Sequence, residues 1–321
     1  MRKQEKNDLA IIEVESLPER IVDKNTQTLR PISEGAEKWL YRSIKCLDHG
    51  FIYLVDYMGN DDAIVQAARV SYGTGTKKIS EDRGLIRYLR RHAHTTPYEM
   101  VEFKFHCSMP IFVARQWIRH RTANVNEYSG RYSEMLDEFY LPESSVLRRQ
   151  SKTNKQGRAE ELTEEQKTQV LDILKKEYET QYQNYQKLLK MNVARELARI
   201  GLSVANYTQW YWKIDLHNLM HFLKLRLDSH AQHEIQVYGQ AMAKIVKDAV
   251  PMAYQAFEDY VVNAITLSGP EREYIVTHEW PDNRPVLECE LSWIKKQINE
   301  KFQNQRETEE FIEKLKLLKL I

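Results

Sequence analysis

The apolar positions of the chain recur with two different periods, and these periods predict a mixture of strands and helices. Residues 50–57 and 207–214 are short runs rich in aromatic and β-branched side chains, while residues 101–107 alternate strictly between apolar and polar, as half-buried strands do. Residues 61–70 and 80–91 carry acidic residues near their start, where the helix dipole favours them. We therefore expect an α+β fold with a mixed or antiparallel sheet flanked by long helices.

Longer helices are predicted in the second half of the chain. A capping box at residues 163–166 begins a long helix, whose stripe of leucines and tyrosines indicates packing rather than a cofactor site. Asp215 is a suitable N-cap for a helix over residues 216–227. The helical pattern of residues 231–262 is broken at Pro251.

The composition limits the classes of protein to which the chain can belong. Of its 321 residues, 42% are hydrophobic and 29% are charged, which is ordinary for a soluble globular protein. The apolar runs are too short to span a bilayer, and residues 1–16 lack the apolar core of a signal peptide. A net charge of +1 gives no long-range field for nucleic acid. We expect a cytoplasmic protein that binds anions locally and has no membrane or nucleic-acid partner.

The cysteines are Cys46, Cys107 and Cys289, which are far apart in sequence and form no CxxC pair. This spacing argues against a zinc ribbon and against a disulfide framework, and it fits a reducing compartment. Cys107 lies within an alternating strand and the other two lie outside the most polar motif of the chain, so none has the setting of an activated nucleophile.

That motif is a polar segment that begins with a predicted helix. Pro110 suits the first helical position, and the helix is expected to run to Arg121, with Gln116, Arg119 and His120 on one face. The following residues are rich in Asn, Ser and Gly and predict an irregular loop. Arginines delivered by a rigid helix end into a polar loop are suited to holding phosphates through paired N–H donors.

The same segment carries a recognisable signature. Arg119-His120-Arg121 is followed after seven residues by Ser129, and Asn126-Glu127 lies between them. This arrangement resembles the RHR-x7-S signature of the flavin-dependent thymidylate synthases, the ThyX family. The resemblance implies conversion of deoxyuridine monophosphate (dUMP) to thymidine monophosphate (dTMP), with methylenetetrahydrofolate as carbon donor, FAD as hydride carrier and NADPH as reductant. It also implies a ThyX-like fold and a homotetramer with active sites shared among subunits.

The resemblance assigns residues to the cofactor and to the substrate. Some members carry Asn or Arg at the positions of Asp215, His217 and His221, so the exact flavin contacts there are open. The expected cofactor-binding residues are Ser71, His94, Thr96, Glu99, Arg119, His120, Arg121, Asn126, Glu127, Asp215, Leu216, His217 and His221. The expected substrate-binding residues are Gln116, Arg119, Glu127, Ser129, Gly130, Arg131, Arg199 and Arg226.

Arg226 is the expected catalytic residue. Carbon-5 of uracil is a poor nucleophile, and without a suitable thiol the remaining route is a positive charge that stabilises negative charge developing on the ring. Ser129 has no base near it in sequence that would activate it as a nucleophile, so we interpret it as a hydrogen-bond donor.

The resemblance covers residues 47–262, the expected thymidylate synthase domain. Residues 1–46 are interpreted as an N-terminal arm, in which residues 9–15 can add an edge strand and residues 33–40 a short helix. Residues 263–321 are interpreted as a charged helical tail, whose apolar stripe suits docking on a partner or on the body of the domain.

A basic, amide-rich segment at residues 145–158 has two interpretations. It is either a disordered surface loop or a mobile lid that meets an anionic cosubstrate. The basic residues of the lid hypothesis are Arg148, Arg149, Lys152, Lys155 and Arg158.

Two other functions stay open at this point. One is a metal-dependent hydrolase using His217, His221, Asp228 and either His230 or His233, although no HExxH motif accompanies them and we expect no metal. The other is a nucleotide- or RNA-binding module built on the RHR helix and the basic loop, against which the near-neutral charge weighs.

Overall fold

The computed structural model describes the backbone of residues 11–13 and, with side chains, residues 30–70, 82–151, 157–280 and 287–321. The chain divides into two compact units, Met1–Val262 and Asn263–Ile321. No helix in the described ranges is both long enough and apolar enough to cross a membrane.

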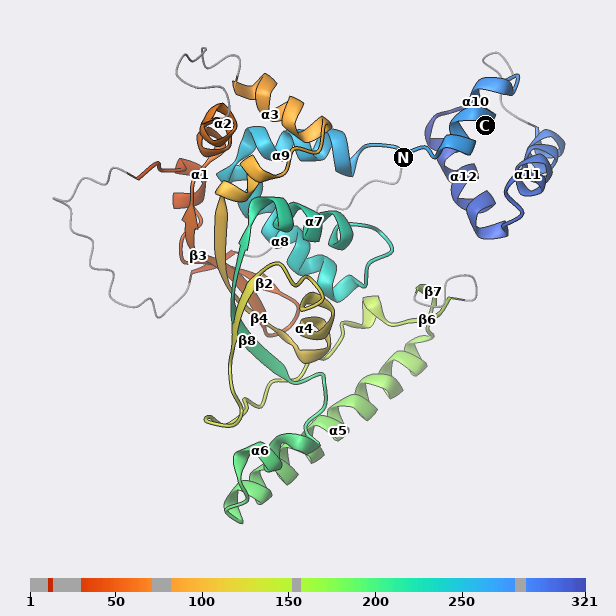
Figure 1. Ribbon diagram of the computed structural model, residues 1–321. Helices are drawn as coiled ribbons and strands as arrows, with labels where there is room; N and C mark the ends of the chain where they lie inside the picture. The colour runs from red at the N-terminus through yellow and green to blue at the C-terminus, as the bar shows by residue number, and fades with distance from the viewer. Residues whose placement is uncertain (1–10, 14–29, 71–81, 152–156, 281–286) are drawn as a thin grey trace. The chain divides into compact units, whose positions relative to one another are not determined.

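A six-stranded sheet forms the centre of the first unit (Figure 1). Every pair of neighbouring strands is antiparallel, so the expected antiparallel sheet and the strands expected at residues 50–57, 101–107 and 207–214 are confirmed. In spatial order the strands are β1 (Ile11–Glu13), β2 (Arg42–Cys46), β3 (Gly50–Met58), β4 (Glu102–Pro110), β8 (Tyr207–Asp215) and β5 (Asn124–Glu127).

Except for α4, which ends before the RHR segment, the helices of the first unit lie close to the positions that the sequence predicts. The capping box at Thr163 and the N-cap at Asp215 are both present, and Pro251 begins a new helix. The helices are α1 (Glu34–Glu37), α2 (Asp61–Val70), α3 (Asp82–Arg91), α4 (Ile111–Trp117), α5 (Glu164–Lys190), α6 (Arg195–Ala198), α7 (Leu216–Arg226), α8 (His233–Ala249) and α9 (Pro251–Phe257). Shorter turns are η2 (Thr96–Met100), η3 (Ser144–Val146), η4 (Arg199–Gly201) and the π-turn η5 (Glu258–Val262), and a separate hairpin pairs β6 (Arg148–Gln150) with β7 (Arg158–Glu161).

One face of the sheet is covered by α4, α7 and α8, because its inward residues are large and apolar (Figure 1). Trp117 of α4 is fully buried, with its ring centroid 5.2 Å from that of Trp212 and 5.1 Å from that of Phe222. The ring centroid of Tyr238 in α8 lies 5.7 Å from that of Trp117, and the Tyr238 hydroxyl donates to the Ser108 carbonyl at 2.8 Å. This aromatic cluster fixes the end of α4 against α7.

Residues 34–46, assigned above to an N-terminal arm, pack within the first unit. Ser33 caps α1 and also donates to the Ala249 carbonyl at 2.7 Å. Trp39 donates to Asp248 at 2.8 Å, and Ile44 of β2 is fully buried. The sheet therefore continues across the expected boundary after Cys46 without a break.

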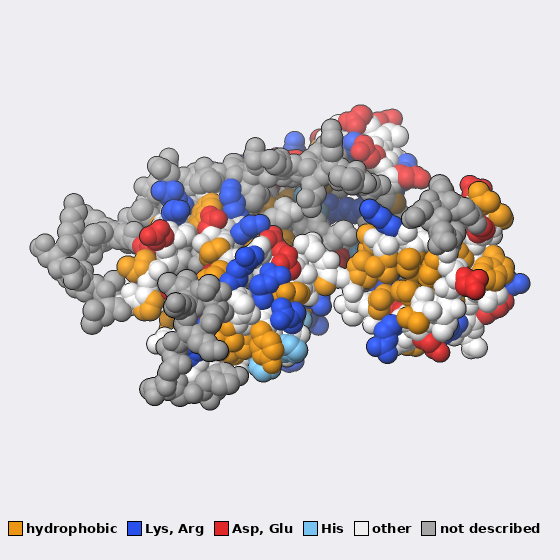
Figure 2. All heavy atoms as spheres, turned by 90° about the horizontal axis from the view of Figure 1, so that it is seen from above, with side chains coloured by type: hydrophobic (Ala, Val, Ile, Leu, Met, Phe, Trp, Pro, Cys, Tyr) orange, Lys and Arg blue, Asp and Glu red, His pale blue; other side chains and the backbone are white. Residues whose placement is uncertain are grey.

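Basic side chains gather on the face of the first unit that is turned to the viewer in Figure 2. Two arginines of α3, Arg87 and Arg91, contact the segment that follows α9. Arg87 forms an ion pair with Asp259, with Nη1 2.6 Å from Oδ2, and Arg91 donates to the Tyr260 hydroxyl at 3.0 Å. These contacts join α3 to η5 and hold the edge of the helical layer.

The second unit has its own core. It consists of α10 (Gly269–Thr277), α11 (Glu288–Phe302) and α12 (Gln305–Leu317). The apolar stripe of α12 contributes Phe311 and Leu315 to this core, so the expectation that the stripe docks on the body of the domain or on a partner is wrong. Other apolar side chains stay at the surface of the unit (Figure 2), where Trp293 is 53% exposed.

Candidate active site

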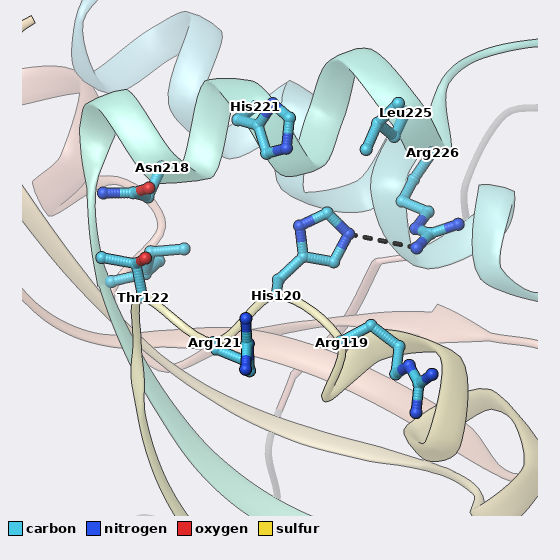
Figure 3. A pocket seen from close by; sticks show the side chains of 9 residues that line it. Arg119, His120, Arg121, Thr122, Asn218, His221, Leu225 and Arg226 are labelled. Atoms are coloured by element: carbon cyan, nitrogen blue, oxygen red, sulfur yellow. Dashed lines mark hydrogen bonds between the residues drawn. The ribbon is translucent and has the colours of Figure 1, made fainter.

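A cavity of about 400 Å³ lies between α7 and the segment that follows α4 (Figure 3). Helix α7 contributes Asn218, His221 and Arg226 from one side, and the RHR segment faces them from the other. The full lining is Arg119, His120, Arg121, Thr122, Ile214, Asn218, His221, Leu225 and Arg226.

The RHR segment is not helical, contrary to the sequence prediction. Pro110 ends β4 and is the N-cap of α4, which ends at Trp117 because that side chain is locked into the aromatic cluster. The N–H of His120 donates back to the Trp117 carbonyl at 3.0 Å, so the chain turns toward α7. Arg119 and His120 reach the cavity from this turn rather than from a helix face.

The expected irregular loop after the RHR segment is also wrong in part. Asn124–Glu127 forms β5, an edge strand paired with β8, with Asn126 opposite Tyr211. The Glu127 carboxylate accepts a hydrogen bond from the Thr208 hydroxyl at 2.8 Å. This pairing joins segments about 85 residues apart in sequence, which local turn propensity cannot predict.

The cavity is cationic. Its lining includes Arg119, Arg121 and Arg226 and contains no carboxylate. Burial lowers the pKa of Arg226, and its Nε is buried without a hydrogen-bond partner in the described part of the chain. Such an unpartnered donor inside a cavity is suited to a ligand that brings an acceptor.

His120 is held neutral beside that arginine. Burial first, and then the charges of Arg226 and His221, lower the pKa of His120 to about 4. Nη2 of Arg226 lies 3.1 Å from Nε2 of His120, and the neutral ring accepts the hydrogen bond at this nitrogen (Figure 3). The contact uses one nitrogen of the guanidinium of Arg226, a residue that lines the cavity.

Four residues of the lining were not singled out from the sequence: Thr122, Ile214, Asn218 and Leu225. Asn218, His221 and Leu225 are separated by three and four residues, so they share one face of α7, and this spacing was the signal available in the sequence. Asn218 also donates from its side chain to Asp215 at 2.7 Å, which fixes the first turn of the helix.

Four of the expected substrate-binding residues form a separate group: Ser129, Gly130, Arg131 and Arg199. Gly130 lies against Arg199, since a Cβ atom on this glycine would stand 3.1 Å from Cδ of Arg199. Arg131 pairs with Glu196 at 3.4 Å, and its N–H donates to the Ser129 hydroxyl at 3.3 Å. None of these residues lines the cavity, and β5 lies between Thr122 of the lining and this group along the chain.

The expected cofactor residues divide between two further places. His94 and Thr96 line a second cavity of about 720 Å³ together with residues of α2 and α3. Glu99 and Asp215 lie close to His217 at the start of α7. Burial and the charge of Arg90 lower the pKa of His217, and the charges of Asp215 and Glu99 raise it by a smaller amount.

Nδ1 of His217 is buried without a hydrogen-bond partner in the described residues. Leu216 is fully buried and its N–H donates to the Val101 carbonyl at 2.8 Å, so its side chain belongs to the core. Ser71 lies outside the described residues.

The basic segment at residues 145–158 is partly built into the fold. Arg158 forms an ion pair with the buried Glu234 of α8, at 2.5 Å. Arg149 donates to Gln166 at 3.1 Å, and Arg148 lies 3.8 Å from Glu161. Lys152 and Lys155, the other two residues of the lid hypothesis, lie outside the described residues.

The described residues contain no group of three or more His, Cys, Asp or Glu side chains placed to hold a metal ion. Cys46 and Cys107 are fully buried, which raises the pKa of each thiol well above its usual range. Cys289 is exposed on α11 of the second unit. None of the three lines the cavity.

Comparison with known proteins agrees with this geometry. The family described as thymidylate synthase complementing protein matches residues 53–252. A flavin-dependent thymidylate synthase of Ruegeria pomeroyi is 57% identical over 246 residues, covering 75% of this chain and 82% of the relative. One from Dictyostelium discoideum is 50% identical over 292 residues, covering 88% and 89%.

A solved structure is also similar. The UMP/dUMP methylase PolB of Streptomyces cacaoi, bound with 5-Br dUMP, superposes with a TM-score of 0.62 at 33% identity, covering 68% of this chain and 98% of that one. The chain therefore belongs to the thymidylate synthase complementing protein family, the family of flavin-dependent thymidylate synthases.

Proposed function

We propose that the chain catalyses the reductive methylation of dUMP to dTMP, with FAD as its flavin, methylenetetrahydrofolate as carbon donor and NADPH as reductant. The observation that carries the proposal is the cationic cavity, in which the neutral His120 orients Arg226 and no carboxylate opposes the arginines. The substrate analogue held by the Streptomyces cacaoi relative, 5-Br dUMP, is a pyrimidine nucleotide of the same class.

The donors of this chain fit a flavin. The unpartnered Nδ1 of His217 and the exposed His221 offer hydrogen bonds at one end of α7, and Arg119 and Arg121 offer charge for a diphosphate. His94 and Thr96 would extend the binding surface into the second cavity. A bound flavin supplies the hydride chemistry, while the protein orients it and excludes water.

Arg226 then acts on the pyrimidine. A guanidinium beside a uracil carbonyl or N3 stabilises negative charge on the ring before carbon-5 attacks, and this charge makes carbon-5 the better nucleophile, an effect worth about 3 kcal/mol for a well-placed donor. Because His120 is neutral, it orients the guanidinium without cancelling its charge. The buried thiols of Cys46 and Cys107 cannot reach this cavity, so activation by charge is the route that the described residues support.

The phosphate is assigned to Ser129, Gly130, Arg131 and Arg199. Since a dianionic phosphate needs several donors, a cluster of two arginines with a serine suits it. As the family resemblance implies, the proposal takes the enzyme as a homotetramer in which one subunit contributes the phosphate site and another the ring site.

The test of the chemistry is direct. Purified protein should show flavin absorbance bands that shift when dUMP is added, and the flavin released on denaturation should co-elute with FAD. With methylenetetrahydrofolate and NADPH, the holoenzyme should form dTMP. A folded protein that binds no flavin, or a flavoprotein that forms no dTMP, contradicts the proposal.

The test of shared sites is subunit complementation. Arg199→Ala and Arg226→Ala should each inactivate the enzyme, but mixed tetramers from co-expression should regain dTMP formation, because some of their sites contain neither substitution. Two copies of Arg226→Ala that differ only in affinity tag are the control. No recovery in the mixed sample would place both arginines in sites formed by one subunit.

A further inference from the structure

The residues assigned to the phosphate lie on two segments that are far apart in sequence. Ser129, Gly130 and Arg131 follow β5, and Arg199 begins the turn η4. The segments meet where a Cβ atom on Gly130 would stand 3.1 Å from Cδ of Arg199. Helix α5 lies between them along the chain and contacts both. The placement of the donors therefore depends on how each segment is attached to α5.

The loop of residues 129–134 is anchored at its two ends. Before it, the Tyr128 N–H donates to the Gln209 carbonyl of β8 at 2.8 Å. After it, Met135 is buried, with 7% of its surface exposed. Residues 131–134 between these anchors are exposed to solvent. The sheet therefore fixes one end of the loop, and the contacts of Met135 fix the other.

Two tyrosines of α5 hold the backbone of Met135. Its N–H donates to Oη of Tyr185 at 3.0 Å, and its carbonyl accepts from Oη of Tyr182 at 3.4 Å. Tyr185 is 2% exposed and forms a small apolar cluster with Met135 and Ala198. Because Ala198 directly precedes Arg199, this one side chain supports both halves of the phosphate group.

The Met135 side chain passes this support on to the donors. A Cβ atom on Gly130 would stand 2.6 Å from Sδ of Met135, so the methionine lies directly against the backbone of the glycine. The Arg131 N–H donates to Oγ of Ser129 at 3.3 Å, which leaves the hydroxyl proton of this serine to donate to a ligand. A shift of Met135 would therefore displace Gly130 and the donors on either side of it.

We propose that Tyr185 is a positioning residue for the phosphate of dUMP, whose hydroxyl fixes Met135 and thereby Gly130 beside Arg199. A phenylalanine would fill the same space in the apolar cluster, so the role belongs to the hydroxyl rather than to the ring. A loop that is fixed before the nucleotide arrives loses less conformational freedom on binding, and this strengthens the affinity. The inference rests on the proposed function, because it takes this group as the phosphate site.

The experiment compares the dissociation constants of dUMP and of deoxyuridine, which lacks the phosphate, for the full-length flavin-loaded protein by calorimetry. The ratio of the two constants measures what the phosphate contributes to binding. Tyr185→Phe should bind dUMP about 5-fold more weakly, as expected when one hydrogen bond that holds the site is lost. It should bind deoxyuridine within about 2-fold of wild type, because the contacts of the ring and the sugar are unchanged.

The steady-state kinetics should show the same separation. In Tyr185→Phe the KM for dUMP should rise by about the factor found for binding, while kcat at saturating dUMP stays within about 2-fold of wild type. A folded Tyr185→Phe with an unchanged ratio of dissociation constants overturns the proposal. So does an equal weakening of dUMP and deoxyuridine, which would show a general loss of structure.

Tyr182→Phe removes the longer of the two hydrogen bonds and should lower the ratio in the same direction, by about 2-fold. If Tyr185→Phe does not fold, Tyr182→Phe decides the outcome, and an unchanged ratio in it overturns the proposal. Tyr178→Phe is the matched control on the same helix, because its ring stacks on Phe139 with 4.9 Å between the ring centroids, outside the Met135 cluster.

The Tyr178→Phe protein should keep the wild-type ratio. A lowered ratio in this control would assign the effect to α5 as a whole and overturn the proposal. A wild type that binds dUMP no better than deoxyuridine would instead refute the assignment of the phosphate in the proposed function.

Discussion

Nη2 of Arg226 lies 3.1 Å from Nε2 of His120, so a neutral histidine of the RHR segment holds the arginine of α7 in a single direction. The histidine is neutral because burial and the guanidinium itself lower its pKa to about 4. Arg226 therefore carries the whole positive charge of the pair. Arg226 lines a cavity whose lining contains no carboxylate.

Arg226→Ala should fold and bind flavin but lose turnover by about 100-fold or more, because one preorganised donor contributes roughly 3 kcal/mol to stabilising the developing charge. Arg226→Lys should recover little, since a lysine has no planar fork with which to contact His120 and face the cavity together. The measurement is single-turnover formation of dTMP. Lys224→Ala, on an exposed position of the same helix, should be close to wild type. Near-normal turnover of Arg226→Ala would remove this residue from catalysis.

His120→Gln should alter the pH dependence of stability. The depressed pKa of His120 means that the unfolded chain binds a proton that the folded chain does not, between about pH 6.5 and about pH 4. Stability is therefore lost as the pH falls through this interval. Glutamine keeps an acceptor for Arg226 but does not titrate.

The measurement compares urea midpoints of the two proteins at pH 7.5 and pH 5. The variant should lose less stability than the wild type on acidification. His217 and His233, whose pKa values burial also lowers, are present in both proteins and cancel in the comparison. Equal losses in both proteins would mean that His120 is already protonated in the folded state.

Much of this architecture could be predicted from the sequence, because it depends on local chemistry. Asp215 has an acceptor side chain at the start of a helix, and its hydrogen bond to the Asn218 N–H is formed as the capping rule expects. The strict alternation of residues 101–107 likewise identifies β4, since one face of the sheet is buried and the other is not.

The rest depends on packing between distant segments. The end of α4 is set by the burial of Trp117 against Trp210 and Trp212, residues almost a hundred positions away. The same is true of β5, which pairs with β8, and of Arg158, whose partner Glu234 follows it by 76 residues. Periodicity carries no information about such partners, so the sequence predicted a longer helix and a loop, and for residues 145–158 it left either a disordered loop or a lid.

Gly239→Ala tests how closely α8 supports the catalytic arginine. A Cβ atom at Gly239 would stand 3.2 Å from Cβ of Arg226, so the arginine must shift by a few tenths of an ångström. We expect little change in stability, because alanine favours a helix interior by about 0.5–1 kcal/mol and offsets the crowding. Turnover should fall several-fold, as expected when a catalytic group is displaced slightly.

Gly84→Ala is the control, since a Cβ atom there meets nothing within 4 Å in α3. It should stabilise the protein slightly and leave turnover unchanged. The double variant Gly239→Ala with Arg226→Ala should be no slower than Arg226→Ala alone, because the glycine acts through the arginine. Additive losses would show that Gly239 affects turnover by another route.

A cysteine-free protein should still make thymidylate. Cys46 and Cys107 are fully buried with raised pKa values, and none of the three cysteines lines the cavity, so the cavity offers no thiolate to add to carbon-6 of uracil. Replacing the two buried cysteines by alanine and Cys289 by serine should cost about 0.5–3 kcal/mol of stability at each buried position, through lost packing. Turnover, measured as dTMP formed per bound flavin at a temperature where both proteins are folded, should stay within a few-fold of wild type. A flavin-loaded, folded triple variant that forms no dTMP would mean that a thiol, rather than the charge of Arg226, makes the uracil reactive.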